Sequence, residues 1–193
     1  MNTPETARPA AAAATALGIG LGGFFDGIVL HQILQLHNTM SAVIPNDTLV
    51  GAKTNMVWDG LFHAFVWLVT GIGVIMLWNA ARRGDVSFDN RLLFGGFLLG
   101  WGLFNVAEGV IDHHILNIHH VYELLGQSAW DWGFLAWGAV MILTGWLLIR
   151  SGSRALRAES ERRDQAGPPV CQSGCDSPTA FLAFVARRYR CRA

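Results

Sequence analysis

Four long apolar stretches constrain the fold of this chain more than any other feature. They cover residues 10–34, 57–80, 92–111 and 129–149. Each is about 20 residues long, the length of helix that crosses the hydrocarbon core of a bilayer. The composition agrees, because 52% of the residues are hydrophobic and 15% are charged, against about 25% charged residues in soluble domains. The sequence therefore predicts an all-α integral membrane protein, a bundle of four transmembrane helices surrounded by lipid.

The basic residues predict how these helices are oriented. One side of the predicted membrane carries the arginines, whereas the loops on the other side contain Lys53 alone. The arginines that flank the predicted helices are Arg8, Arg82, Arg83, Arg91, Arg150, Arg154 and Arg157. Since Lys and Arg collect in cytoplasmic loops, we expect a multi-pass protein of the bacterial inner (plasma) membrane with both termini in the cytoplasm.

Two pairs of segments repeat each other without a gap. Residues 26–38 reappear as residues 108–120, at an offset of 82, and an acid, a glycine and two histidines recur in register. Residues 58–65 match residues 130–137 at an offset of 72. We predict two tandem helical hairpins, about 10–80 and about 92–150, related by a pseudo-twofold axis along the membrane normal.

Two flanking segments lie outside the membrane domain of residues 10–150. Residues 1–9 are predicted to be a cytoplasmic N-terminus, and residues 151–193 a cytoplasmic tail that starts charged and amphipathic and is otherwise disordered. All three cysteines lie in this tail. The spacing of Cys171 and Cys175 is a weak signal for a metal site, so we assign no function to it.

Ionisable residues gather at the outer ends of the predicted helices, where charge is costly and usually marks a functional site. Rotation by about 100° per residue places many of them on inward helix faces. The predicted metal ligands are Asp26, His31, Asp59, His63, Glu108 and His113. The predicted outer shell is His37, Asp112, His119, His120 and Asp131.

Three of these assignments depend on the course of the backbone. His37, His119 and His120 face inward only if the first and third helices continue beyond His31 and His113. His114 falls on the lipid side in the same projection, so we predict an interfacial residue there.

The chemistry of this residue set favours a transition metal. Four inward carboxylates repel one another unless a cation or a protonated histidine balances them, and a divalent metal ion does this directly. Carboxylate and imidazole without a thiolate suit Zn, Fe, Mn or oxidised Cu. One acid per helix with added histidine also follows the plan of dinuclear carboxylate sites in four-helix bundles, although the usual Glu-x-x-His spacing is absent. We expect metal handling, redox chemistry or assembly of a metalloprotein.

Several alternatives stay open. His31 and His113 could be axial ligands of a haem in an electron-transfer subunit. The cluster could serve cation or proton transport, which requires an oligomeric pore because the inner halves of the helices lack ionisable residues. The protein could also be a structural subunit of a membrane complex, with homo-oligomers or other membrane proteins as partners. In the plainest interpretation, the histidines are interfacial and Asp59 and Asp131 are helix N-caps.

Other function classes find little support. The net charge is zero and no basic face follows a groove-sized element, which argues against nucleic acid as a partner. The sequence has no serine nucleophile motif and no phosphate-cradling loop, so an enzyme would have to be metal-dependent. Such an enzyme would be a hydrolase with His63 or Asp59 as the base to a metal-bound water, or a dinuclear oxidase, and the catalytic residues stay open.

Three segments carry a family resemblance: GFFDGIVLHQ at residues 23–32, DGLFH at 59–63 and EGVIDHH at 108–114. They resemble a family of bacterial four-helix membrane proteins of unknown function. The resemblance covers about residues 15–150 and leaves out the cysteine-bearing tail. It implies an integral membrane protein and no particular activity.

Overall fold

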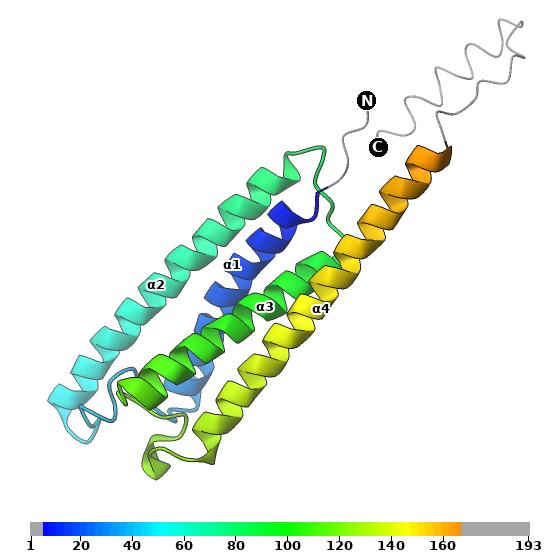
Figure 1. The fold of residues 1–193 in the computed structure, drawn as a ribbon. Coiled ribbons are helices and arrows are strands. Elements are labelled where there is room, and N and C mark those ends of the chain that lie inside the picture. The colour runs from blue at the N-terminus through cyan, green and yellow to red at the C-terminus, as the bar shows by residue number, and fades with distance from the viewer. Residues whose placement is uncertain (1–5, 167–193) are drawn as a thin grey trace, which may run out of the picture. The chain divides into compact units, whose positions relative to one another are not determined.

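A computed structural model describes residues 6–166, and these residues form a helical bundle (Figure 1). The elements are α1 (Arg8–Phe25), the π-helix η1 (Asp26–Ile33), α2 (Leu49–Ala81), α3 (Asn90–Glu108), the π-helix η2 (Gly109–Ile115), the short 3₁₀-helix η3 (Glu123–Leu125) and α4 (Ala129–Ala166). The described range contains no β-strand, and its one β-bridge joins Thr6 and Val86.

Four helical segments within this range are long and apolar enough to cross a membrane: Arg8–Ile33, Leu49–Ala81, Asn90–Ile115 and Ala129–Ala166. The prediction of an all-α membrane protein is confirmed. Two helices are longer than the apolar stretches suggest, because α2 begins at Leu49 and α4 continues to Ala166. The start of the predicted tail is therefore helical, and the rest of it, with the cysteines, lies outside the described residues.

Glycines let α1 approach α3 closely. A Cβ atom on Gly18 would lie 2.1 Å from the carbonyl oxygen of Phe97, and one on Gly100 would lie 2.0 Å from that of Thr15. No side chain fits at such a distance, so both positions require glycine. Close backbone contact of this kind is a common basis of helix association in membranes, where apolar side chains gain nothing by leaving lipid.

Large apolar side chains cover the outer faces of α2 and α4. Trp67, Ile75, Trp137 and Leu147 are all more than half exposed. In water such a surface would be unfavourable, whereas lipid tails solvate it well. The polar residues therefore have only the bundle interior and its ends available to them.

The first and third helices both end in π-helical segments. At their ends, Leu34 N–H donates to Val29 O and Leu116 N–H to Ile111 O, each at 2.8 Å. The next residue of each segment, Gln35 or Asn117, has a left-handed backbone with φ of 51° or 48°. The backbone changes direction at each of these two residues.

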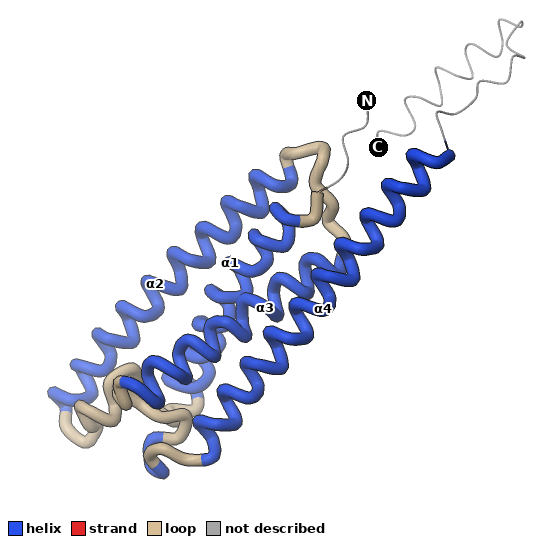
Figure 2. The backbone as a smooth tube through the Cα atoms, in the orientation of Figure 1, coloured by secondary structure: helices blue, strands red, loops and turns tan. Residues whose placement is uncertain are grey.

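This reversal overturns one expectation from the sequence. The helices do not continue past Ile33 and Ile115, so His37, His119 and His120 lie in loops. The residue types predict this stop only weakly, because Gln35 is not a residue that favours a left-handed backbone and Asn117 is a weak signal beside glycine or proline. The loops 34–48 and 116–128 lie at one end of the bundle, where α2 and α4 begin (Figure 2).

The two loops are joined to each other. Ala42 N–H donates to Ile118 O at 3.0 Å, and Glu123 N–H donates to Leu36 O at 3.1 Å. The Ser41 hydroxyl donates to the Glu123 carboxylate at 2.8 Å. These bonds fix the loops across the end of the bundle and carry their histidines inward.

Candidate metal centre

Two carboxyl groups lie where α-helix turns into π-helix. Asp26 begins η1 and Glu108 ends α3, and their side chains point into the end of the bundle. Asp26 is 2% exposed and Glu108 is 7% exposed. Buried carboxylates are costly unless a positive partner balances them.

His31 and His113 lie one turn further along the π-helices, and each faces an acid of the following helix. The Nδ1 atom of His31 donates to Asp59 Oδ1 at 3.1 Å, and the Nδ1 atom of His113 lies 3.2 Å from Asp131 Oδ1. The Nε2 atom of His31 is 2.9 Å from Asp26 Oδ2, yet the two atoms are not aligned for a hydrogen bond.

The loop histidines cross between the two hairpins. His37 Nδ1 donates to the carbonyl oxygen of Val121, and His119 Nδ1 donates to that of Thr39, both at 3.1 Å. Their Nε2 atoms face the carboxylates, His37 at 3.8 Å from Asp26 Oδ1 and His119 at 3.5 Å from Glu108 Oε1. Each loop therefore fixes a histidine that the other loop carries.

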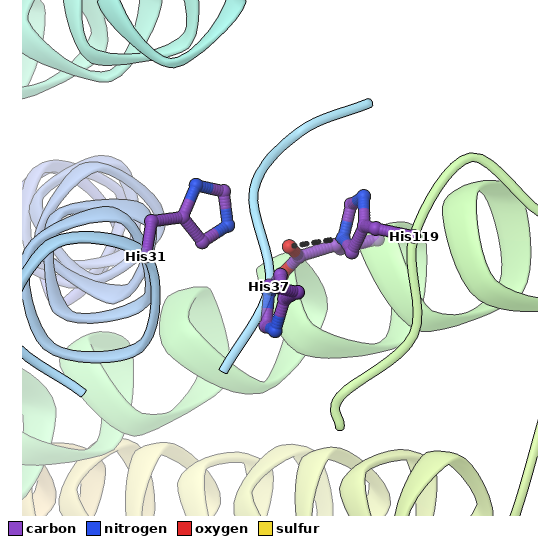
Figure 3. Close-up of side chains that lie close together, drawn as sticks. His31, His37 and His119 are labelled. Atoms are coloured by element: carbon purple, nitrogen blue, oxygen red, sulfur yellow. Dashed lines mark ion pairs between the residues drawn. The ribbon is translucent and has the colours of Figure 1, made fainter. Parts of the chain in front are cut away.

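The four imidazoles form one compact group. The rings of His37 and His119 stack at 4.7 Å with an interplanar angle of 4°, and Figure 3 shows both of them beside His31. His31 meets the edge of His37 at 4.5 Å, and His113 meets the edge of His119 at 4.8 Å. All four side chains are at most 3% exposed.

The anchored Nδ1 atoms decide which nitrogen is free. A carbonyl oxygen only accepts, so the Nδ1 atoms of His37 and His119 carry the protons and their Nε2 atoms keep a lone pair. The Nε2 atoms of all four imidazoles are buried without a hydrogen-bond partner among residues 6–166. Metal-binding histidines in proteins are oriented in the same way, by an acceptor on the second ring nitrogen.

Burial keeps the loop histidines in the form that binds metal. It lowers the pKa of His37 from 6.5 to about 4, and it lowers the pKa of His119 well below the ordinary value. Both imidazoles are therefore neutral near pH 7. A metal ion requires a neutral imidazole, because a protonated one has no lone pair to donate.

The spacing of the donor atoms suits a metal ion. One donor atom from each of His31, His37, Glu108 and His119 lies within 4.8 Å of the others. Two ligands at about 2.1 Å from one ion are about 3.0–3.4 Å apart, since the angle between them is about 90–110°. The Nε2-to-carboxylate distances of 2.9, 3.5 and 3.8 Å lie close to this range.

Asp59 and Asp131 contact the cluster through the Nδ1 atoms of His31 and His113. Asp59 accepts hydrogen bonds from the side chains of Gln32, Asn38 and Thr39 as well as His31. Its interpretation as a helix N-cap is wrong, because α2 begins ten residues earlier and Thr48 caps it. Asp131 lies in the first turn of α4.

Asp131 does accept hydrogen bonds from backbone groups ahead of its helix. Ser128 N–H and Val121 N–H donate to its carboxylate at 2.8 and 3.0 Å. It thus combines the role of a cap with contact to His113, and it also fixes the second loop.

A family model described as "Predicted membrane protein (DUF2243)" matches residues 13–152. The chain belongs to this family. No curated protein matches it, and no solved structure does. The matched region contains every residue of the cluster, so the site is part of the domain that defines DUF2243.

Some predicted residues of this DUF2243 protein lie apart from the cluster. His63 is half-buried beside the rings of Phe24 and Phe62 and lies over Gly27, where a Cβ atom would be 2.5 Å from its Nε2 atom. Asp112 is partly buried, and no ion pair within the described range joins it to an imidazole.

Two other predicted histidines differ in position. His120 lies 3.6 Å from Asp131 through Nδ1, behind His113, which agrees with an outer position. His114 packs against Trp132, and its Nδ1 atom donates to Gly109 O at 2.7 Å. The prediction that His114 lies outside the cluster agrees with this packing.

Sequence reasoning missed Thr39 and Val121. Both residues act through the main chain, each accepting from a histidine through its carbonyl oxygen and donating its amide to Asp59 or Asp131. A main-chain contact leaves no trace in residue type. The only available signal was their spacing, since Thr39 and Val121 are 82 residues apart like the histidines.

Proposed function

We propose that this protein binds a transition metal in its membrane domain and serves metal handling, redox chemistry or assembly of a metalloprotein. One observation carries the proposal: four buried imidazoles present unpartnered Nε2 atoms, and three of them lie 2.9–3.8 Å from buried carboxylates. Without a cation or a protonated imidazole, these lone pairs and carboxylates face one another among buried side chains. A divalent ion relieves this repulsion directly.

The distribution of charge supports an extracytoplasmic site. The cluster lies at the end of the bundle formed by loops 34–48 and 116–128. Arg82, Arg83 and Arg91 lie in or next to the turn between α2 and α3, at the other end (Figure 1). Since arginine-rich loops stay in the cytoplasm, the cluster faces the outside of the cell.

The donor set narrows the metal to Zn, Fe, Mn or oxidised Cu. The cluster combines imidazole with the carboxylates of Asp26 and Glu108, a combination that these ions accept. A haem between His31 and His113 has less support. The stacked rings of His37 and His119 occupy the space between those two histidines and contact both of them.

The proposal is tested by metal analysis of the detergent-purified protein, both as isolated and after loading with each of the four metals. A double variant, His37→Ala with His119→Ala, removes the two crossed imidazoles. We expect bound metal in the parent and at least a tenfold lower occupancy in the double variant, because two neutral donors are lost.

His114→Ala is the matched control, since it removes an imidazole that packs against Trp132 and has no place in the cluster. It should keep the metal content of the parent. A folded parent that binds none of the four metals would contradict the proposal. A visible absorption spectrum on the same samples detects haem, whose Soret band would favour the alternative.

A further inference from the structure

We infer that the cluster holds two transition-metal ions, one in each half of the protein. This inference rests on the proposed function and adds the number of ions and their ligands. The first subsite consists of Asp26, His31 and His37. The second subsite consists of Glu108, His113 and His119. Each would supply two imidazoles and one carboxylate to a divalent ion.

The donor atoms of the first subsite lie close together around the carboxyl group of Asp26. Both imidazoles face the same carboxyl group, His31 Nε2 at 2.9 Å from Asp26 Oδ2 and His37 Nε2 at 3.8 Å from Asp26 Oδ1. The rings of His31 and His37 meet edge to face at 4.5 Å. The two Nε2-to-carboxylate distances are close to the separation of about 3.0–3.4 Å between two ligands of one ion.

The second subsite consists of the residues at the matching sequence positions, with one imidazole-to-carboxylate ion pair among the described residues where the first subsite has two. His119 Nε2 lies 3.5 Å from Glu108 Oε1, and the ring of His113 meets that of His119 at 4.8 Å. The Nε2 atom of His113 and the Oε2 atom of Glu108 are buried without hydrogen-bond partners in the described part of the chain. They are the donors that the subsite offers to its ion.

The direction of the stacked imidazoles separates the two subsites. His37 and His119 lie face to face, yet the Nε2 atom of His37 faces Asp26 whereas that of His119 faces Glu108. The two lone pairs are therefore directed at different carboxylates. Neighbouring ions on either side of the stack would use both of them.

A single ion explains less of the structure. The most compact set of donors comprises His31, His37, Glu108 and His119, which together could hold one ion. That arrangement leaves Asp26 and His113 unused, although Asp26 Oδ2 and His113 Nε2 are buried without hydrogen-bond partners. An unsatisfied buried polar group costs about 1–3 kcal/mol, and more when it is charged. Two ions give every one of these atoms a partner.

Each subsite also has one aspartate that contacts the Nδ1 atom of its π-helical histidine. Asp59 holds the Nδ1 atom of His31, and Asp131 faces that of His113. Two imidazoles and one carboxylate form a recurrent ligand set for a single divalent metal, with further coordination positions left open. The geometry thus offers two complete ligand sets.

Counting ions per chain tests the inference. The full-length protein is stripped with a chelator, loaded with Zn²⁺, and weighed by native mass spectrometry. We expect two Zn²⁺ ions per chain in the parent. The pairs Asp26→Asn with His37→Ala and Glu108→Gln with His119→Ala should each retain one ion, and the combination of all four changes should retain none.

His114→Ala is again the control and should bind two ions. One ion in the parent overturns the two-ion inference but leaves the proposed function intact, whereas no ion in the parent overturns both. Loss of both ions in each half variant overturns the assignment of separate subsites. Circular dichroism and size exclusion verify that the variants are folded, and the count in the parent stands without them.

Discussion

The two halves of the bundle build similar sites from partly different residues. In the first half, α1 and η1 carry Asp26 and His31 toward Asp59 on α2. In the second half, Asp131 on α4 faces His113 of η2. What the halves share is an inner carboxylate, a π-helical histidine with an acid behind it, and a loop histidine held by a carbonyl oxygen of the opposite loop.

The two halves differ in the identity of the inner acid and in the residues next to these shared groups. The inner acid is Asp26 in one half and Glu108 in the other, and the neighbour of the supporting aspartate is Asn38 or His120. His63 has the apolar Leu135 as its sequence counterpart. The residues of the cluster thus keep their chemical type between the two halves, whereas the residues beside it differ. The duplication itself stays a prediction from the sequence.

The largest expected effect comes from removing a supporting acid. Asp59→Ala should lower the free energy of unfolding by about 3–5 kcal/mol, because it leaves the Thr39 amide and the His31 imidazole buried without their acceptor. Thermal unfolding in detergent micelles measures the loss. Asp85→Ala, which removes an exposed partner of Arg83, is the control and should change stability little. Equal stability of the two variants would refute the role of Asp59.

The matching change in the second half should lower stability, because Asp131 also accepts from the Val121 and Ser128 amides, and should lower metal affinity as well. Asp131→Ala removes the acid that faces His113 Nδ1, and loss of such a supporting group lowers metal affinity by about 10–100-fold. Competition with a chromophoric chelator for Zn²⁺ measures the affinity. Ser128→Ala is the control, since the Ser128 backbone amide still donates to Asp131. An unchanged affinity in Asp131→Ala would show that the halves are not supported alike.

The close glycine contact between α1 and α3 gives a third test. Gly18→Ala and Gly100→Ala should each destabilise the protein by about 1–3 kcal/mol, since the added methyl group would overlap a carbonyl oxygen of the facing helix. The two losses should be similar, because the two contacts are equivalent. Gly71→Ala is the control, as a Cβ atom there meets nothing within 4 Å. A loss in only one of the glycine variants would contradict the equivalence.

The smallest effect is expected where the halves already differ. His63→Leu gives the first half the residue type of its counterpart Leu135 and should leave the number of bound ions unchanged. Its effect on Zn²⁺ affinity should stay within about twofold, as for residues outside a binding site. Chelator competition checks this value. Loss of an ion would instead restore His63 as a ligand, as the sequence predicts.

The fold was predictable because few structures satisfy four apolar stretches of bilayer length. Backbone groups in lipid must bond within the segment, so helices follow directly from hydropathy. The residue types of the cluster were predictable for a related reason: His and acid inside apolar segments need partners. Asp26, His31, Glu108 and His113 all lie in the cluster.

The arrangement of the ligands was harder to predict. Helical projection placed His37 and His119 far out along continuous helices, whereas the left-handed residues Gln35 and Asn117 turn the chain back and bring both imidazoles against the inner acids. It placed His63 inward, and that side chain does lie over the buried Gly27 with its Nε2 atom buried, although outside the compact donor group. A local backbone reversal and the close approach of two helices depend on tertiary contacts that periodicity does not encode.

The hydrogen bonds between the two loops would also set the rate at which a bound metal ion enters or leaves the cluster. Val121 holds His37 and Thr39 holds His119, so lifting either loop releases a histidine in both halves. Entry and exit then require one cooperative local opening, whose frequency and not the diffusion of the ion sets the rate. If the cluster binds a metal ion as proposed, that ion would leave slowly even in the presence of a strong chelator.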